Sequence, residues 1–290
     1  MSNRLKTNIY AFITVFIWAT AFPVTKIIGD ELSPNSVSLI RCATAAVFML
    51  VVGGSFGMKK PASGKDGLTF AAAGIMGFAL YLIFFTKGIG TLTSATSSVI
   101  IALTPVMTAI AATKVFKEKI NKVGWAAIGT AFVGVMILMF WQGTLSVNEG
   151  ILWTLLGAVM FATYNIISRF LTKRGYTSIE IVAYGMLAGA FAMLWAAPGA
   201  MEEMSSTNLA TVFCAVYLGL MPSAISYMLW AKAMSFAEKT SEVTNYMFVT
   251  PMLSTLLGFA MLGELPDAGT YIGGAIIIAA VVIFGLKGKE

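Results

Sequence analysis

The 290-residue sequence contains no histidine, only two cysteines and few charged residues. Histidine is the commonest metal ligand and the usual proton shuttle, so its absence argues against a metal site, and no other pattern predicts a cofactor. Cys42 and Cys214 both fall inside apolar runs, which is typical of small buried side chains and not of a disulfide. No Walker A loop is present, so this chain is not expected to pump with ATP.

The scarcity of charge also argues against an enzyme. Only 11% of the residues are charged. Intramembrane proteases and lipid-modifying enzymes need paired aspartates, a serine with a base, or a set of metal ligands inside the bilayer, and the apolar runs contain no such set. We therefore expect no catalytic residues.

Apolar residues, in contrast, are abundant. They make up 58% of the chain and give a mean hydropathy of +0.85, which is far outside the range of a soluble domain. Ten apolar stretches are about 20 residues long, enough to cross a hydrocarbon core of about 30 Å. They cover residues 8–28, 35–54, 67–87, 93–113, 122–140, 150–170, 178–198, 208–231, 239–261 and 268–286. The sequence thus predicts an all-α membrane protein with ten transmembrane helices.

Basic residues gather in the loops that share a side with the amino terminus, and acidic residues gather in the opposite loops. The positive-inside rule then places both termini in the cytoplasm of a prokaryotic plasma membrane. The net charge of +6 is concentrated in these short loops and needs no nucleic-acid partner. The first apolar run lacks a cleavage site and is expected to be a retained span.

The two halves of the sequence resemble each other. "FIWATAFPVTK" at 16–26 aligns with "VMFATYNIISR" at 159–169, which matches Lys26 with Arg169. Further along, Pro105 matches Pro251 and Glu118 matches Glu264. Because five helices are an odd number, the second copy enters the membrane from the opposite face, so residues 1–143 and 144–290 are predicted to be two inverted five-helix repeats. Such a pair suits alternating access.

These motifs together resemble the drug/metabolite transporter superfamily, and within it the ten-helix EamA-type transporters. The resemblance rests on the aromatic-Ala-Thr stretch of the first helix, on Thr-Pro in the fourth and ninth, and on a Glu before the fifth and tenth. It covers essentially the whole chain. It implies that helices one to four and six to nine line a central cavity, that helices five and ten are outer braces, and that small metabolites, amino acids among them, are exported or exchanged.

Polar and aromatic residues near the middle of the spans are candidates for binding a small-molecule substrate. Amides are costly in hydrocarbon unless satisfied, so they should face the interior. For each residue alone, an interhelical hydrogen bond is an equally good explanation. The candidates are Trp18, Thr20, Tyr81, Phe84, Ser97, Ser98, Tyr164, Asn165, Tyr227, Trp230, Asn245 and Tyr246.

Charged residues and prolines inside the spans are candidates for gating and for helix bending. Arg41 needs a partner, which Asp30, Glu31 or the carboxylate of a passing solute could supply. Lys26 and Arg169 are interpreted as caps or snorkelling cations at helix ends. Pro105 and Pro251 are expected to bend their helices or free a carbonyl beside a polar cavity.

Glu242 is the best candidate for proton coupling. It follows Glu238 by one helical turn, and partial desolvation together with the neighbouring carboxylate would raise its pKa. The N-terminal helix dipole and nearby lysines oppose this effect, so an ordinary N-terminal acid remains the simpler interpretation.

Small residues recur at four-residue spacing in helices five and ten. Ala126, Thr130 and Gly134 form one stripe, and Gly269 and Gly273 form the other. Such stripes let backbones approach closely, either inside the fold, which we favour, or across a homodimer.

The sequence therefore predicts a secondary active or facilitative transporter of small organic metabolites in the lipid bilayer, an amino-acid or metabolite exporter working by alternating access. A carrier for sugars, nucleosides or organic cations is the alternative. A channel fits less well, because the sequence shows no ring of like charges.

Overall fold

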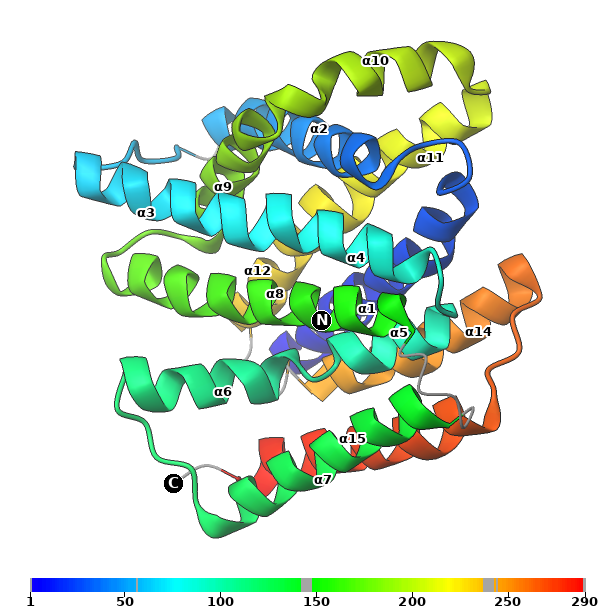
Figure 1. Ribbon diagram of the computed structural model, residues 1–290. Coiled ribbons are helices and arrows are strands. Elements are labelled where there is room, and N and C mark those ends of the chain that lie inside the picture. The colour runs from blue at the N-terminus through cyan, green and yellow to red at the C-terminus, as the bar shows by residue number, and fades with distance from the viewer. Residues whose placement is uncertain (1, 56, 142–147, 237–242, 244, 289–290) are drawn as a thin grey trace.

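The computed structural model describes residues 2–55, 57–141, 148–236, 243 and 245–288, and every element within them is a helix (Figure 1). The first half contains α1 (Asn3–Ile28), α2 (Pro34–Ser55), α3 (Gly64–Gly74), η1 (Ile75–Leu80), α4 (Tyr81–Ile89), α5 (Ser94–Ile101), α6 (Thr104–Val115) and α7 (Lys122–Phe140). The second half contains α8 (Glu149–Lys173), α9 (Ser178–Ala192), η2 (Leu194–Ala196), α10 (Ala197–Ser206), α11 (Leu209–Leu220), η3 (Met221–Ile225), α12 (Ser226–Phe236), η4 (Asn245–Val249), α14 (Thr250–Leu262) and α15 (Ala268–Lys287).

The number of membrane spans differs from the ten predicted. Among the described residues, eight helices are long and apolar enough to cross a membrane, and α9 with the helix that follows it makes a ninth, bent by 50°. Only part of the predicted span 239–261 is described, and its apolar helix α14 is too short to count alone. The all-helical membrane architecture is confirmed, whereas the count of ten is not.

Polar side chains begin most of the long helices. Ser63, Thr93, Asn121, Asn148 and Asp267 each accept a hydrogen bond from a backbone N–H in the first turn of the helix that follows. An N-cap satisfies donors that the helix itself cannot pair. Each of these side chains therefore pairs one backbone donor at the start of its helix.

The helices pair across the two halves of the chain. α1 packs against α12 and α14, while α8 packs against α4 and α6. α2 packs against α9, and α7 against α15, which lie side by side at one edge of the bundle (Figure 1). The contacts that α1 makes in the first half thus have counterparts in the contacts that α8 makes in the second half.

Glycines bring α7 and α15 into backbone contact. A Cβ added at Gly134 would lie 2.9 Å from the carbonyl oxygen of Gly273 and 2.6 Å from Ile277 Cγ1. Ala126 and Thr130, which the sequence places in the same stripe, are instead exposed, and the buried face of α7 carries Ala127 and Ala131. The close approach in this interface therefore serves packing within the chain.

Replacing Gly134 by Val is expected to destabilise the protein, by about 1–3 kcal/mol, because the added side chain must push α15 away. Gly129→Val is the matched control, since Gly129 lies on the same helix and a Cβ there meets nothing within 4 Å. Thermal unfolding in detergent measures the difference. Equal melting temperatures for the two variants would contradict the contact.

Prolines stand where two membrane helices are interrupted. α5 ends at Ile101 and α6 begins at Thr104, so Pro105 occupies the first turn of a new helix. Pro251 occupies the same place in α14, directly after the 3₁₀ turn η4. Proline costs no hydrogen bond in a first turn. The predicted bends are thus breaks that begin new helices.

Two π-helical turns interrupt the membrane helices that begin at residues 64 and 209. η1 covers Ile75–Leu80 and η3 covers Met221–Ile225, so the two turns begin 146 positions apart, the same offset that separates Pro105 from Pro251. π turns are uncommon and often lie at functional sites. Tyr81 directly follows η1 and Tyr227 lies two residues after the end of η3, and both tyrosines face the same cavity.

Candidate functional site

Two adjoining cavities run through the centre of the bundle. The first, which we call the central cavity, has a volume of about 880 Å³. The second, which we call the vestibule, has a volume of about 1780 Å³. Trp18, Pro105, Phe161, Tyr227 and Met247 line both cavities. The two spaces therefore meet at a collar of aromatic and apolar side chains.

The central cavity is mainly aromatic. Of the residues predicted to bind substrate or to move, it is lined by Trp18, Arg41, Tyr81, Ser98, Pro105, Tyr227 and Pro251. Phe22, Phe78, Phe85, Phe161 and Ser223 are also part of the wall, although the sequence does not mark them as candidates. An aromatic wall offers large apolar contact area with few polar partners. The site thus suits a solute with an apolar body.

Trp18 is held in place by the π turn η3. Its indole Nε1 donates to the carbonyl oxygen of Pro222 at 3.0 Å. Its ring also lies 5.5 Å from that of Tyr227 and 5.1 Å from that of Trp230, between ring centroids. The indole is therefore fixed on the path between the two cavities.

The vestibule extends to the end of the bundle where α6 and α8 finish, which we call the lysine-rich end because Lys114, Lys173 and Lys287 lie in the last turns of α6, α8 and α15. Tyr164, Asn165 and Trp230 line it, as does an ion pair between Arg169 and Glu118. The Asn165 amide donates to Thr108 Oγ1 at 3.2 Å. The side chains of Arg169 and Glu118 are 43% and 37% exposed, so the vestibule is open at this end.

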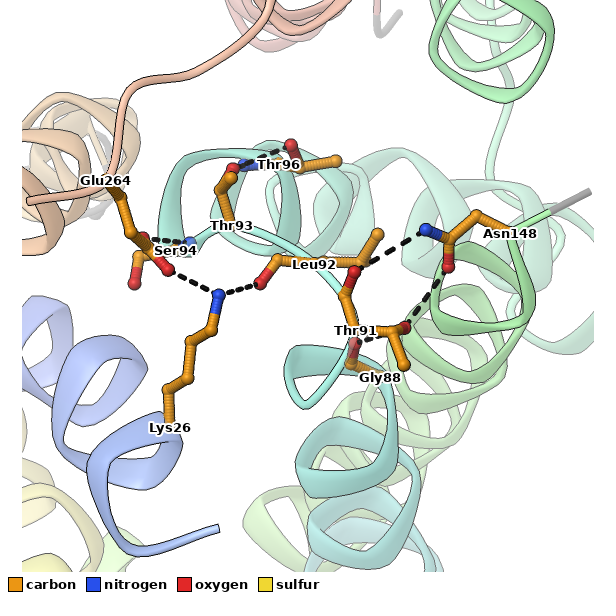
Figure 2. Close-up of polar contacts among 9 residues, drawn as sticks. All are labelled: Lys26, Gly88, Thr91, Leu92, Thr93, Ser94, Thr96, Asn148 and Glu264. Carbon is orange, nitrogen blue, oxygen red and sulfur yellow. Dashed lines mark hydrogen bonds and ion pairs between the residues drawn. The ribbon is translucent and has the colours of Figure 1, made fainter. Parts of the chain in front are cut away.

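At the opposite end, where α1 finishes and α15 begins, a second ion pair joins the two halves of the chain. We call this end the acidic end because Glu31, Glu149 and Asp267 lie there. Lys26 Nζ lies 2.6 Å from Glu264 Oε1 and donates to the carbonyl oxygen of Leu92 at 2.8 Å. The backbone N–H of Ser94 donates to the other oxygen of Glu264 at 2.7 Å (Figure 2). The Glu264 side chain is only 10% exposed. This cluster ties α1, the start of α5 and the segment after α14 together.

The two ion pairs occupy equivalent places in the two halves. Lys26 matches Arg169 and Glu264 matches Glu118 in the sequence alignment of the halves. Each pair joins a cation of one half to a carboxylate of the other. The interpretation of Lys26 and Arg169 as simple caps is therefore incomplete, because both are ion-paired.

Arg41 is buried, with 5% of its surface exposed, and its partner is Ser223. Neither carboxylate predicted from the sequence reaches it. Glu31 accepts hydrogen bonds from Thr207 and Asn208, which lower the pKa of its carboxyl, and Asp30 is exposed. Both lie in the turn after α1, outside the bundle. Arg41 instead turns inward toward the π turn η3.

Four predicted residues lie away from both cavities. Thr20 donates to the Ile17 carbonyl and shares a hydrogen bond with Tyr217, and Phe84 stacks on Trp153. Ser97 is fully buried, and Tyr246 packs against a small apolar cluster. Mid-span position alone does not reveal which face of a helix a residue occupies. The side chain of Asn245 and all of Glu242 lie outside the described residues.

Comparison with known proteins assigns this chain to a known family. The sequence profile of the EamA-like transporter family matches residues 5–140 and, a second time, residues 148–286. The chain belongs to the EamA-like transporter family. It is thus a multi-pass membrane protein of a transporter family within the drug/metabolite transporter superfamily.

Two relatives of this EamA-like transporter align over nearly its whole length. A probable terminal-alkyne amino-acid exporter of Streptantibioticus cattleyicolor is 27% identical over 285 residues, which is 98% of this chain and 95% of that protein. An uncharacterized transporter of Bacillus subtilis, YdfC, is 28% identical over 273 residues, 93% of this chain and 88% of the relative. A solved crystal structure, 18% identical, shares the fold with a TM-score of 0.63 over 96% of this chain and 95% of its own.

Proposed function

We propose that this EamA-like protein is a secondary or facilitative carrier that exports small organic metabolites by alternating access. The observation that carries the proposal is a cavity open at the lysine-rich end and closed at the acidic end by Lys26 and Glu264, with an equivalent ion pair already present at the open end. A solute entering the vestibule would reach the central cavity and wait there for the opposite end to open.

The same chemistry is available for closing the vestibule. Lys26 and Glu264 close their end by also binding the backbone of Leu92 and Ser94. The counterparts of these two residues in the second half are Glu238 and Thr240, which lie outside the described residues. In the alternate state, Arg169 and Glu118 would become as little exposed as Lys26 and Glu264 are here. Residues 1–143 and 144–290 would then act as two inverted repeats that exchange roles.

Amino acids are the leading substrate class. This rests on the aromatic central cavity, on Arg41 within it, and on the exporter among the relatives. Sugars, nucleosides and organic cations are the alternatives. A channel is less well supported, because a partly buried, hydrogen-bonded ion pair joins the two halves at the acidic end.

The test is to identify the solute and then to measure how it moves. Solutes in the medium of overexpressing and deleted cells are compared by metabolomics, and each one that changes is offered to proteoliposomes containing the purified protein. A carrier gives saturable uptake that is accelerated by unlabelled solute on the far side. Conductance without saturation would identify a channel instead.

Orientation in the membrane is checked by labelling. Single cysteines near Glu149 and Glu202 are expected to react with an impermeant thiol reagent in intact cells, whereas cysteines near Lys60 and Lys173 are not. The expectation follows from the concentration of basic residues at the lysine-rich end, which we propose is cytoplasmic together with both termini. Labelling of the lysine-rich loops from outside would reverse the proposed orientation. The vestibule would then open to the exterior, as expected of an importer.

Proton coupling through Glu242 and assembly into a dimer stay predictions.

A further inference from the structure

The guanidinium of Arg41 has an unused edge. Arginine offers five N–H donors, and here Nε and Nη2 both donate to the Ser223 hydroxyl, at 3.3 and 3.2 Å. Nη1 is buried and has no hydrogen-bond partner among the described residues. The side-on edge, Nε with Nη2, is thus occupied by Ser223. The end-on edge, formed by Nη1 and the second proton of Nη2, has no described partner, and its geometry matches that of a planar anion.

The charge of Arg41 is also unpaired. Within the described part of the chain, the carboxylates that form ion pairs do so with Lys26, Arg169 and Arg174, and none does so with Arg41. A buried charge without a partner is strongly unfavourable, so it calls for an anion. The neighbouring Phe85 ring, 5.9 Å from the guanidinium carbon, relieves only a little of that cost.

We propose that the free edge of Arg41 binds the carboxylate of the transported solute, whose apolar or aromatic body lies against Trp18, Tyr81 and Tyr227. The proposal rests on the transport function proposed above and narrows its substrate class to monocarboxylates. A guanidinium edge fits a carboxylate with two parallel charge-assisted hydrogen bonds.

The remaining wall of the central cavity favours this class over the alternatives. No described residue that lines it carries a carboxylate, so an organic cation would find no counter-ion there, only aromatic faces beside the positive charge of Arg41. The hydroxyls of Ser98 and Ser223 already donate to the carbonyls of Ala95 and Leu218, which leaves few donors for a sugar. The amino group of an amino acid would meet only aromatic faces. The carboxylate is therefore the recognised group, and the amine is dispensable.

Binding of four matched probes to the purified protein tests the proposal by isothermal titration calorimetry. L-phenylalanine and 3-phenylpropionate carry the carboxylate, with and without the amine. L-phenylalanine methyl ester and phenethylamine lack it. Both acids are expected to bind with affinities within a few-fold of each other, and the ester and the amine about tenfold more weakly or worse, because a charge-assisted hydrogen bond is lost.

Variants assign the preference to Arg41. Arg41→Lys keeps the charge but loses the pair of N–H donors on one guanidinium edge, and Arg41→Gln loses both the charge and the pair. The binding affinity of both acids should therefore fall about tenfold or more in each variant. Lys87→Gln is the matched control, because Lys87 lies over the Trp153 ring, away from the central cavity, and it should bind as the wild type does. The comparison of acid with ester needs no variant, so it holds even where an Arg41 variant fails to fold.

Failure of this proposal is distinguishable from failure of transport. Equal binding of acid and ester, stronger binding of phenethylamine than of either acid, binding by neither acid, or an undiminished preference for acids in a folded Arg41 variant would each overturn carboxylate recognition while leaving saturable transport of another solute intact. Carboxylate-dependent binding in proteoliposomes that show no carrier flux would instead refute the transport function.

Discussion

A disulfide between residues 94 and 258 is expected to abolish transport, and a reductant is expected to restore it. Ser94 begins α5 and Gly258 lies in α14, and a Cβ at position 258 would lie 3.0 Å from Ser94 Cβ. Disulfides join Cβ atoms about 3.8 Å apart, so the helices need part only slightly. The bond would cross the acidic end beside Glu264 and hold that end closed.

The experiment uses a background of Cys42→Ala and Cys214→Ala, because both native cysteines are free thiols. Ser94→Cys with Gly258→Cys is oxidised, and substrate counterflow is measured before and after reduction. The two single-cysteine variants are the controls, which matters because a side chain at 258 also approaches Glu264. Cross-linked protein that transports at the rate of the reduced form would contradict the proposal that this end must open.

Removing the charge of Glu264 is expected to open the acidic end. Glu264→Gln leaves Lys26 bound only to the Leu92 carbonyl and weakens the bond from the Ser94 N–H. Loss of a hydrogen-bonded charge pair of this kind costs about 1–3 kcal/mol, which is a shift of roughly 5- to 150-fold in the balance between closed and open states. The readout is the rate at which a cysteine at position 94 reacts with an impermeant thiol reagent.

Glu118→Gln is the matched control, since it removes the equivalent carboxylate at the lysine-rich end. It should leave position 94 at least as protected as in the wild type. Exchanging the partners, Lys26→Glu with Glu264→Lys, should restore part of the protection that either single change removes. Equal labelling rates in the wild type and Glu264→Gln would show that the ion pair does not hold this end closed.

Much of the helix layout could be predicted from the sequence, because apolar runs and basic loops are local signals. The sequence could not predict which face of a helix points into the cavity. Thr20 and Tyr81 are both polar and both mid-span, yet only Tyr81 lines the central cavity. Arg41 was recognised as needing a partner, but Ser223 lies 182 positions away and only the packing of α2 against η3 brings it near.

The two ion pairs correspond to a pattern that the sequence already contains. Lys26 and Arg169 match between the halves, and so do Glu264 and Glu118, which already suggests two equivalent pairs of opposite charge. Sequence offsets cannot say whether such residues meet within one half or across the two. The fold supplies the answer, because α1 packs against α14 and α8 against α6.

The two π turns have a consequence for comparing relatives. A π turn holds one more residue than the α-helical turn it replaces, so η1 and η3 each act as a one-residue insertion inside a membrane helix. A relative whose corresponding helix is purely α-helical should align with a single-residue gap there, in the middle of a span where gaps are normally penalised. Forcing an ungapped alignment would rotate every later residue of that helix by about 100° and assign Tyr81 or Tyr227 to the wrong face.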